Sequence, residues 1–305
     1  MTRAVIDIGS NSCRLLVVDD DDRELVRRTD TTRLAQGLVD GGAVQPDALD
    51  RTIVQLREYR AVLDSFGVDS PRIVTTAVAR RADAVSRATL LDAVTAVLGH
   101  RPEVLTGPQE GRLAYLGAVR GVPAPGGRTL VVDIGGGSTE MIVGEGDEVV
   151  AVASLPLGCV SLTERELAHD PPRPDELTNA IGAVQDEIEQ AIIVQRELTA
   201  FDHVIGVAGT LVTVAMVEMG LAEFRREAVH GFTLTRAAAE DVFRTLATES
   251  FDDRVHNPGL ARSRADVIVG GCCIVVGLMR ALRLAEITIS VTDLLDGALA
   301  SVPLR

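Results

Sequence analysis

The chain has 305 residues, of which 46% are hydrophobic and 24% charged. This length and balance are typical of a folded globular protein with more than one domain, and they exclude an intrinsically disordered one. The net charge of −14 argues against a general nucleic-acid binder, which would present a basic surface. The start of the chain lacks the apolar run of a signal peptide, and no apolar stretch reaches the roughly 20 residues of a membrane span. We therefore expect a cytoplasmic protein with no nucleic-acid or membrane partner.

The basic residues and cysteines exclude several kinds of chemistry. The sequence contains no lysine, which excludes both the lysine of a Walker A loop and Schiff-base chemistry on lysine. The four cysteines show neither metal-binding spacing nor a disulfide framework, and we expect buried, reduced thiols.

The first part of the chain alternates short apolar runs with amphipathic helices. Strands are expected at 4–8, 14–18, 72–76 and 103–105, with a charged hairpin turn at 19–23. Helices are expected from Pro46, over 83–98 and over 108–120, and a proline stands at the start of the first and the third.

A run rich in glycine and proline, from Gly121 to Gly127, is the clearest linker. We place the domain boundary there, giving domains 1–121 and 122–305. Beyond it, strands are expected at 129–133, 139–143, 149–154, 203–207 and 286–290, and helices at 175–198, 211–219, 265–282 and 293–300. The last helix, about 293–301, is expected to pack back on the first domain.

The most informative feature is an internal repeat, with one copy on each side of the linker. Val-Ile-Asp-Ile-Gly-Ser-Asn-Ser begins at Val5, and Val-Val-Asp-Ile-Gly-Gly-Gly-Ser begins at Val131; each is followed by a second apolar strand. This pattern predicts two similar domains, each opening with a hairpin whose turn faces the other domain across a cleft.

The turns of both hairpins have the composition of phosphate-binding loops. Glycine lets backbone N–H groups converge on one point, where they bind phosphate oxygens, and hydroxyl side chains add donors. A plain tight hairpin turn is the alternative for either copy alone. The candidate phosphate-binding residues are Ser10, Asn11 and Ser12 in the first turn and Gly135, Gly136, Gly137, Ser138 and Thr139 in the second.

Three carboxylates are candidates for a metal site. Asp7 and Asp133 each end a buried strand, where an uncompensated charge is costly. Glu140 lies on the strand after the second turn, and its alternative is a solvent-facing position. Mg²⁺ binds a few carboxylates together with water and phosphate oxygens, so these residues fit Mg²⁺, with Mn²⁺ as the other choice.

Segments 4–16 and 130–141 resemble the phosphate-binding loops of the exopolyphosphatase and guanosine pentaphosphate phosphatase family, which belongs to the sugar kinase, actin and Hsp70 superfold. Segments 75–80, 106–117, 154–161, 206–210, 258–271 and 290–298 fit the family in order, so the resemblance covers essentially the whole chain. It implies an α/β fold with two actin-like (ribonuclease H-like) domains and a cleft between them.

The resemblance also implies roles for single residues. Glu110 takes the place of the catalytic glutamate and Arg80 that of a phosphate-contacting arginine. From the residues alone, the preferred interpretation of Glu110 is an acid that complements the dipole at a helix amino terminus. The family often has two adjacent acids here, but this chain has Gln109 before Glu110. Further candidate phosphate contacts are Gly209, Thr210 and Arg264, and Arg14, Arg33 and Arg112 are weaker candidates.

The resemblance implies an exopolyphosphatase that releases orthophosphate from the end of inorganic polyphosphate. Longer family members carry further carboxyl-terminal domains, so a preference for short chains is expected. The alternatives are a guanosine pentaphosphate phosphohydrolase, a kinase of the same superfold, and a non-catalytic polyphosphate or alarmone sensor. A homodimer is expected from the family.

Overall fold

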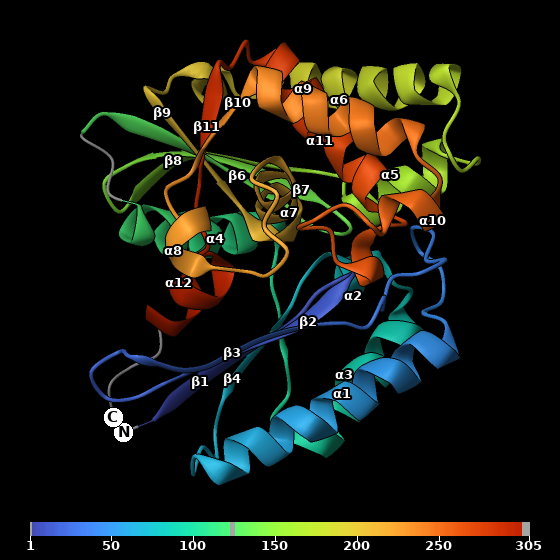
Figure 1. Cartoon of the computed structure of the whole chain (residues 1–305). Helices are drawn as coiled ribbons and strands as arrows, with labels where there is room; N and C mark the ends of the chain where they lie inside the picture. The colour runs from blue at the N-terminus through green and yellow to red at the C-terminus, as the bar shows by residue number, and fades with distance from the viewer. Residues whose placement is uncertain (1, 123–125, 301–305) are drawn as a thin grey trace. The chain divides into compact units, whose positions relative to one another are not determined.

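The computed structural model describes residues 2–122 and 126–300, and the chain divides into two compact units (Figure 1). The first unit runs up to Leu113 and includes the chain from Leu294 onward, and the second is Ala114–Asp293. The division falls inside helix α4 (Gly107–Gly121), just before the predicted linker. Residues 123–125 of that linker lie outside the described residues.

The first unit is a five-stranded sheet with the order β3-β2-β1-β4-β5. The first three strands are antiparallel, and β4 and β5 run parallel to β1. The elements are β1 (Arg3–Ile8), β2 (Ser12–Val18), β3 (Glu24–Thr31), α1 (Pro46–Ser65), β4 (Arg72–Thr75), α2 (Ala77–Arg81), α3 (Ala84–Leu98), β5 (Glu103–Val104) and α12 (Leu294–Ala300).

Alternation along β1 decides which side chains enter the core of the first unit. Ile6 and Ile8 pack with α1 and α3, which lie side by side along the sheet (Figure 1). Asp7 points to the opposite face because successive side chains of a strand alternate. Helix α12 packs on β1 and β2, and Arg27 of β3 forms an ion pair with Asp296 of α12 at 2.6 Å. The last helix therefore belongs to the first unit.

The second unit is a six-stranded sheet with the order β10-β11-β9-β6-β7-β8. Its strands are β6 (Arg128–Ile134), β7 (Thr139–Glu145), β8 (Glu148–Leu155), β9 (His203–Val207), β10 (Thr233–Thr235) and β11 (Glu286–Ile289). Its helices are α5 (Cys159–Glu166), α6 (Pro174–Val194), α7 (Ala208–Glu218), α8 (Arg226–Val229), α9 (Arg236–Thr248), α10 (Phe251–Arg254) and α11 (Ile268–Ala281), with short 3₁₀ turns η1 (Arg196–Thr199) and η2 (Arg262–Arg264).

The two sheets share one topology. An antiparallel trio, β6-β7-β8, is followed by β9 parallel to β6 and β11 parallel to β9, which repeats β1-β2-β3 with β4 and β5. Strand β10 is an addition at one edge of the second sheet. The internal repeat in the sequence is thus a repeat of structure, and each unit is an actin-like, ribonuclease H-like domain.

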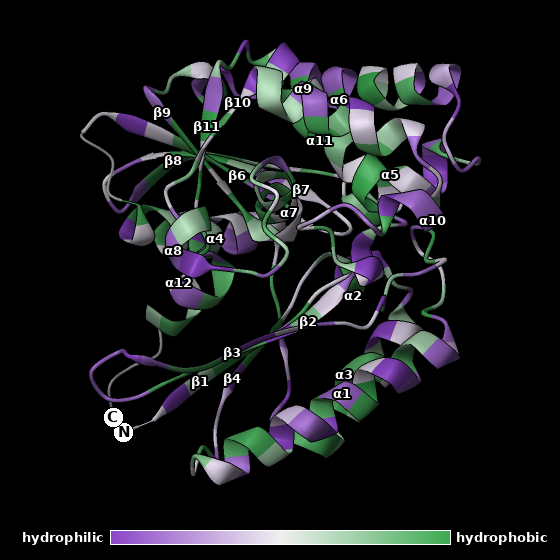
Figure 2. Cartoon of the chain, in the orientation of Figure 1, coloured by the Kyte–Doolittle hydropathy of each residue, from purple (hydrophilic) through white to green (hydrophobic). Residues whose placement is uncertain are grey.

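Helix α11 is the centre of the second core. Every residue from Ile268 to Met279 is buried, and the helix packs against α5, α6 and α9 (Figure 2). Tyr115 and Ala118 of α4 join a separate apolar cluster with Val131 and Ile142 of the sheet. All four cysteines are buried and free, as predicted. Within the described residues, no helix combines the length and apolar character needed to cross a membrane.

The core of the first unit gives a direct test of the fold. We expect Leu56→Ala to lower the free energy of unfolding by about 2–5 kcal/mol, because Leu56 is fully buried on α1 and its loss leaves a cavity. The control is Val54→Ala on the same helix, where the side chain is 56% exposed and an effect within about 0.5 kcal/mol is expected. Urea unfolding measures both, and equal effects would contradict the assigned face of α1.

Candidate functional site

The first hairpin carries a buried ion pair beside its turn. The register of β1 and β2 places Asp7 directly opposite Arg14, so both side chains lie on the same face. The Arg14 Nη2 and Nε atoms donate to Asp7 Oδ2 at 2.6 and 2.9 Å, and Asp7 is only 3% exposed. Arg14 therefore offsets the charge of Asp7, and burial alone no longer calls for a cation at this carboxylate.

The carbonyl groups of the first turn are bound by the loop that follows β3. Ser10 O accepts from the Ala35 N–H at 2.9 Å, and Asn11 O accepts from the N–H groups of Thr32 and Arg33 at 3.0 and 2.9 Å. Within the described residues, no backbone carbonyl accepts from the N–H of Ser10 or Asn11. Ser10 Oγ and Asn11 Oδ1 are also buried without a hydrogen-bond partner there. The turn thus has polar groups to offer to a ligand.

Arg80 and Glu110 meet in the same unit. Arg80, on the short helix that follows β4, donates from Nη1 to Glu110 Oε2 at 2.6 Å and to Leu105 O at 2.9 Å. Glu110 stands in the first turn of α4 and is 7% exposed. The structure therefore brings together the two residues that the sequence predicted from separate segments.

Burial is the main influence on the pKa of Glu110. Burial raises the pKa of this carboxyl above the ordinary glutamate value, the Arg80 charge and hydrogen bond lower it, and the Asp7 charge raises it further. The net pKa is raised, which suits a group that must accept a proton near neutral pH. The same balance shows that Glu110 lies within electrostatic reach of Asp7 and Arg14.

The second hairpin carries two carboxylates where the first carries an ion pair. Asp133 lies directly opposite Glu140 in the register of β6 and β7, and the two are 5% and 1% exposed. Glu140 Oε1 accepts from Ser154 Oγ of β8 at 2.8 Å. Like charges directly opposite on paired strands repel, and burial strengthens the repulsion. This donor set of buried carboxylate oxygens fits a hard divalent cation such as Mg²⁺.

The amino terminus of α5 binds the carbonyl groups of the second hairpin turn. Gly135 O accepts from the Cys159 N–H at 3.0 Å, and Gly136 O accepts from the Val160 N–H at 2.9 Å. No backbone carbonyl among the described residues accepts from the N–H of Gly136 or Gly137. As in the first unit, the carbonyls are bound and the N–H groups are available, which is the geometry of an anion-binding nest.

Gly158 makes this contact with the turn possible. A Cβ atom at this position would lie 2.2 Å from the carbonyl carbon and oxygen of Gly136 and 2.3 Å from Gly137 N. No side chain fits in that space. Ser138 and Thr139 complete the hairpin, and the Thr139 hydroxyl donates to Leu157 O at 2.5 Å. The sequence analysis missed Gly158, because the approach is between segments more than 20 residues apart.

A second group of predicted residues gathers at the carboxyl end of β9. Ala208 has a φ of 68°, a strained value for a residue other than glycine, as the chain turns into α7. At Gly209, a Cβ would lie 2.1 to 2.5 Å from the guanidinium of Arg264. Burial raises the pKa of the Cys159 thiol, and the Arg264 charge and a hydrogen bond with Thr210 lower it in part. Gly209, Thr210 and Arg264 are therefore brought together beside the start of α5.

These residues form one group within the second unit. Asp133, the last residue but one of β6, pairs in register with Val207, which ends β9, so the second hairpin turn and the Gly209 turn follow adjacent parallel strands. The carboxyl ends of adjacent parallel strands are a common place for ligands in α/β folds. Asp7, Arg80 and Glu110 belong to the first unit. In the described part of the chain, Asp19, Asp20 and Asp21 also come close together, but they form a mostly exposed turn.

Comparison with known proteins identifies the family to which the chain belongs. The sequence matches the Ppx/GppA phosphatase family over residues 16–305. The chain belongs to this family. Exopolyphosphatase 2 of Mycobacterium tuberculosis is 35% identical, with 98% of each chain covered. Guanosine-5'-triphosphate,3'-diphosphate pyrophosphatase of Vibrio cholerae is 31% identical over 96% of this chain, and the match spans 58% of that relative's length.

Solved structures agree with this assignment over the whole fold. A crystal structure described as an exopolyphosphatase-like protein has a TM-score of 0.91 at 31% identity, covering 99% of this chain and 98% of the other. The Ppx/GppA family member from Aquifex aeolicus has a TM-score of 0.81 at 32% identity, covering 99% and 97%. The resemblance noted in the sequence and the predicted fold class are confirmed.

The Gly158 contact yields a stability test for this Ppx/GppA family member. We expect Gly158→Ala to lower the melting temperature by several degrees, because the added Cβ must displace the backbone of the second turn. The control is Gly182→Ala in α6, where nothing lies within 4 Å and alanine favours the helix by about 1 kcal/mol. Thermal unfolding of both variants measures this, and an unchanged Gly158→Ala would contradict the tight contact.

Proposed function

We propose that this protein is an exopolyphosphatase, which hydrolyses the terminal phosphoanhydride of inorganic polyphosphate and releases orthophosphate. The observation that carries the proposal is the Arg80–Glu110 pair: a buried carboxylate with a raised pKa is bound to an arginine beside a turn with available donors. The relatives named exopolyphosphatase support polyphosphate as the substrate. The overall charge of −14 means that these donors and arginines must provide the local attraction for a polyanion.

Phosphate binding is assigned to the two turns and to the Gly209 group. The available N–H groups of Ser10 and Asn11, with the Ser12 hydroxyl, bind phosphoryl oxygens from the first unit. In the second unit, the N–H groups of Gly136 and Gly137 bind phosphoryl oxygens, and Gly135 and Ser138 lie on either side of them. Arg264, Gly209 and Thr210 provide a further phosphate contact, since a guanidinium can donate two parallel hydrogen bonds to one phosphate.

The cation is assigned to Asp133 and Glu140. Their paired, buried carboxylates fit Mg²⁺ or Mn²⁺, and when bound the ion neutralises charge on the phosphoryl oxygens. Ser154 orients Glu140 through the hydrogen bond at 2.8 Å. A role for Asp7 as a further ligand through water stays a prediction, because Arg14 already binds its carboxylate.

Glu110 is assigned to the attacking water. Its carboxylate accepts a proton as the water oxygen bonds to the terminal phosphorus and the bond to the bridging oxygen breaks. The leaving chain is one phosphate shorter and carries the bridging oxygen as an anion. Arg80 stabilises the charge on the transferring phosphoryl group and keeps Glu110 ionised.

The second candidate is a guanosine pentaphosphate phosphohydrolase that uses the same groups. The Vibrio cholerae relative, whose name is guanosine-5'-triphosphate,3'-diphosphate pyrophosphatase, favours it. Parallel measurement of orthophosphate release from the two substrates separates these candidates. A sensor would bind polyphosphate without releasing phosphate, and a kinase would bind ATP in the absence of polyphosphate. The predicted homodimer, the cytoplasmic location and the preference for short chains remain predictions.

The assay that tests the function compares wild type with Glu110→Gln. We expect wild type to release orthophosphate from polyphosphate with Mg²⁺ and to stop when the metal is chelated. Glu110→Gln is expected to lower kcat by about 10²–10⁴-fold while polyphosphate still binds, because the amide cannot accept a proton. Glu189→Gln, an exposed acid on α6, is the control for loss of one charge. Near-normal turnover in Glu110→Gln would remove this residue from the mechanism.

The raised pKa of Glu110 predicts a pH profile. A general base acts only when ionised, so kcat falls as the pH drops through the pKa of Glu110 in the enzyme–substrate complex. Because burial raises that pKa, we expect the fall at a pH above the ordinary glutamate value of about 4.3. The measurement is kcat between pH 4.5 and 8.5 at saturating substrate and Mg²⁺. Full activity down to pH 4.5 would contradict the shift.

A further inference from the structure

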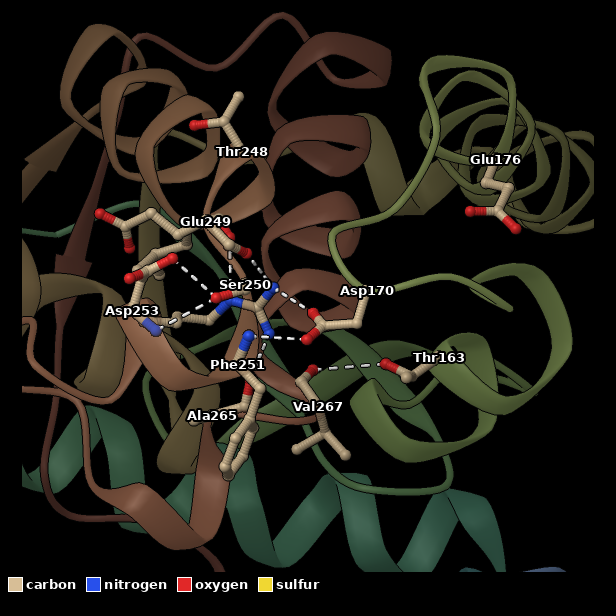
Figure 3. Close-up of polar contacts among 12 residues, drawn as sticks. Thr163, Asp170, Glu176, Thr248, Glu249, Ser250, Phe251, Asp253, Ala265 and Val267 are labelled. Atoms are coloured by element: carbon tan, nitrogen blue, oxygen red, sulfur yellow. Dashed lines mark hydrogen bonds and ion pairs between the residues drawn. The ribbon is translucent and has the colours of Figure 1, made fainter.

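Arg254 is the most buried cation in the second unit. Its side chain is 2% exposed, and it stands first among the largest fully buried side chains of the described residues. Its guanidinium donates from Nη1 to Ala265 O at 2.7 Å, from Nη2 to Glu249 O at 2.7 Å and to Asp170 Oδ1 at 2.8 Å. Figure 3 shows these acceptors gathered from three separate segments. A fourth bond runs from Nε to Leu246 O at 2.9 Å.

Burying an arginine in a core carries a large desolvation free energy. Moving a guanidinium out of water costs several kcal/mol, and only one of its four acceptors is charged. A hydrophobic side chain of similar volume would often give equal or greater stability. The guanidinium has a structural effect that a hydrophobic side chain lacks. Its planar, rigid set of donors fixes the position of each carbonyl that it binds.

The segment that Arg254 fixes is the one that presents Arg264. Ala265, whose carbonyl accepts from Arg254, is fully buried and directly follows Arg264. Turn bonds on both sides complete the segment: Arg264 N donates to Ala261 O at 2.8 Å, and Val267 N donates to Arg264 O at 3.1 Å.

Helix α10 holds this segment at a second point. The guanidinium carbon of Arg262 lies 5.2 Å from the centre of the Phe251 ring. The Phe251 N–H donates to Asp170 Oδ2 at 2.6 Å, so Asp170 ties both ends of α10 (Figure 3). Helix α10 thus contacts the Arg264 segment on both sides, through the side chain of Arg262 and through the carbonyl of Ala265.

The end of the Arg264 side chain lies directly against Gly209. A Cβ at position 209 would overlap the Arg264 guanidinium, so the present placement of this side chain depends on the absence of a side chain at 209. Because the guanidinium is the end of a flexible side chain, the backbone at its base must be fixed if it is to stay there, and misplacement by about 1 Å is costly in binding sites.

We propose that Arg254 is a positioning residue, which fixes the Arg262–Val267 segment so that the Arg264 guanidinium stays against Gly209, the place from which it binds a substrate phosphate. The claim rests on the proposed phosphate contact of Arg264. Arg254 itself touches no substrate and acts only through the backbone of Ala265.

The test compares Arg254→Met, which keeps volume and removes every donor, with Arg264→Gln and with the double variant. We expect Arg254→Met to raise KM for polyphosphate about tenfold, the size of one lost hydrogen bond to a charged group, with a smaller change in kcat. The double variant is expected to be no worse than Arg264→Gln alone, because both changes remove the same contact. Multiplied effects in the double variant would overturn the proposal. Arg254→Lys serves if the Met variant does not fold.

The matched control is Ile188→Ala in α6, whose side chain is fully buried in the second unit and takes no part in the hydrogen bonds of Arg254. We expect a lower melting temperature, because the change leaves a cavity, with KM within twofold of wild type. A rise in KM equal to that of Arg254→Met would mean that general destabilisation explains both.

A crystal structure of the Arg254→Met protein without substrate tests whether Arg254 determines the position of the Arg264 guanidinium. We expect the Arg264 guanidinium to leave its contact with Gly209. An unmoved guanidinium would overturn the positioning role even if the protein is an exopolyphosphatase. Conversely, a displaced guanidinium in a protein that releases no phosphate would support the positioning role while the proposed function fails.

Discussion

The site depends on one hydrogen-bonding constraint: the carbonyl groups of both hairpin turns are already occupied. The loop after β3 binds those of Ser10 and Asn11, and the start of α5 binds those of Gly135 and Gly136. Because the carbonyls are bound, the peptide planes are fixed and the N–H groups of each turn are left for a ligand. The two hairpins, in separate units, therefore have the same hydrogen-bonding arrangement but different supporting elements. A loop binds the carbonyls of the first turn, and a helix binds those of the second.

The repeat preserves this geometry but changes its charge. The first strand of each hairpin has an aspartate as its last residue but one, Asp7 in β1 and Asp133 in β6. The residue opposite it is Arg14 in the first unit and Glu140 in the second. The first hairpin therefore carries an ion pair beside its turn, whereas the second carries two buried carboxylates. Under the proposed function, the first unit supplies a phosphate site with a base nearby, and the second supplies a phosphate site with a divalent cation.

Much of the fold followed from the sequence, because apolar runs and the repeated Asp-Ile-Gly motif mark β1 and β6 directly. Strand β3 was missed because Glu24–Thr31 is an edge strand rich in charge, without an apolar run. The pairing of Asp7 with Arg14 follows from counting across the turn, once the register is known. Gly158 and Arg254 had no local signal, since their roles arise from contacts with distant segments.

The most direct measurement of the central claim is an NMR titration of the Glu110→Gln protein with polyphosphate. The account predicts that the amide protons of Ser10 and Asn11 in the first unit, and of Gly136 and Gly137 in the second, move downfield, as amides do when they bind phosphate. Gly146, in the turn between β7 and β8, is expected to stay where it is. Unmoved resonances in either hairpin turn would contradict the account.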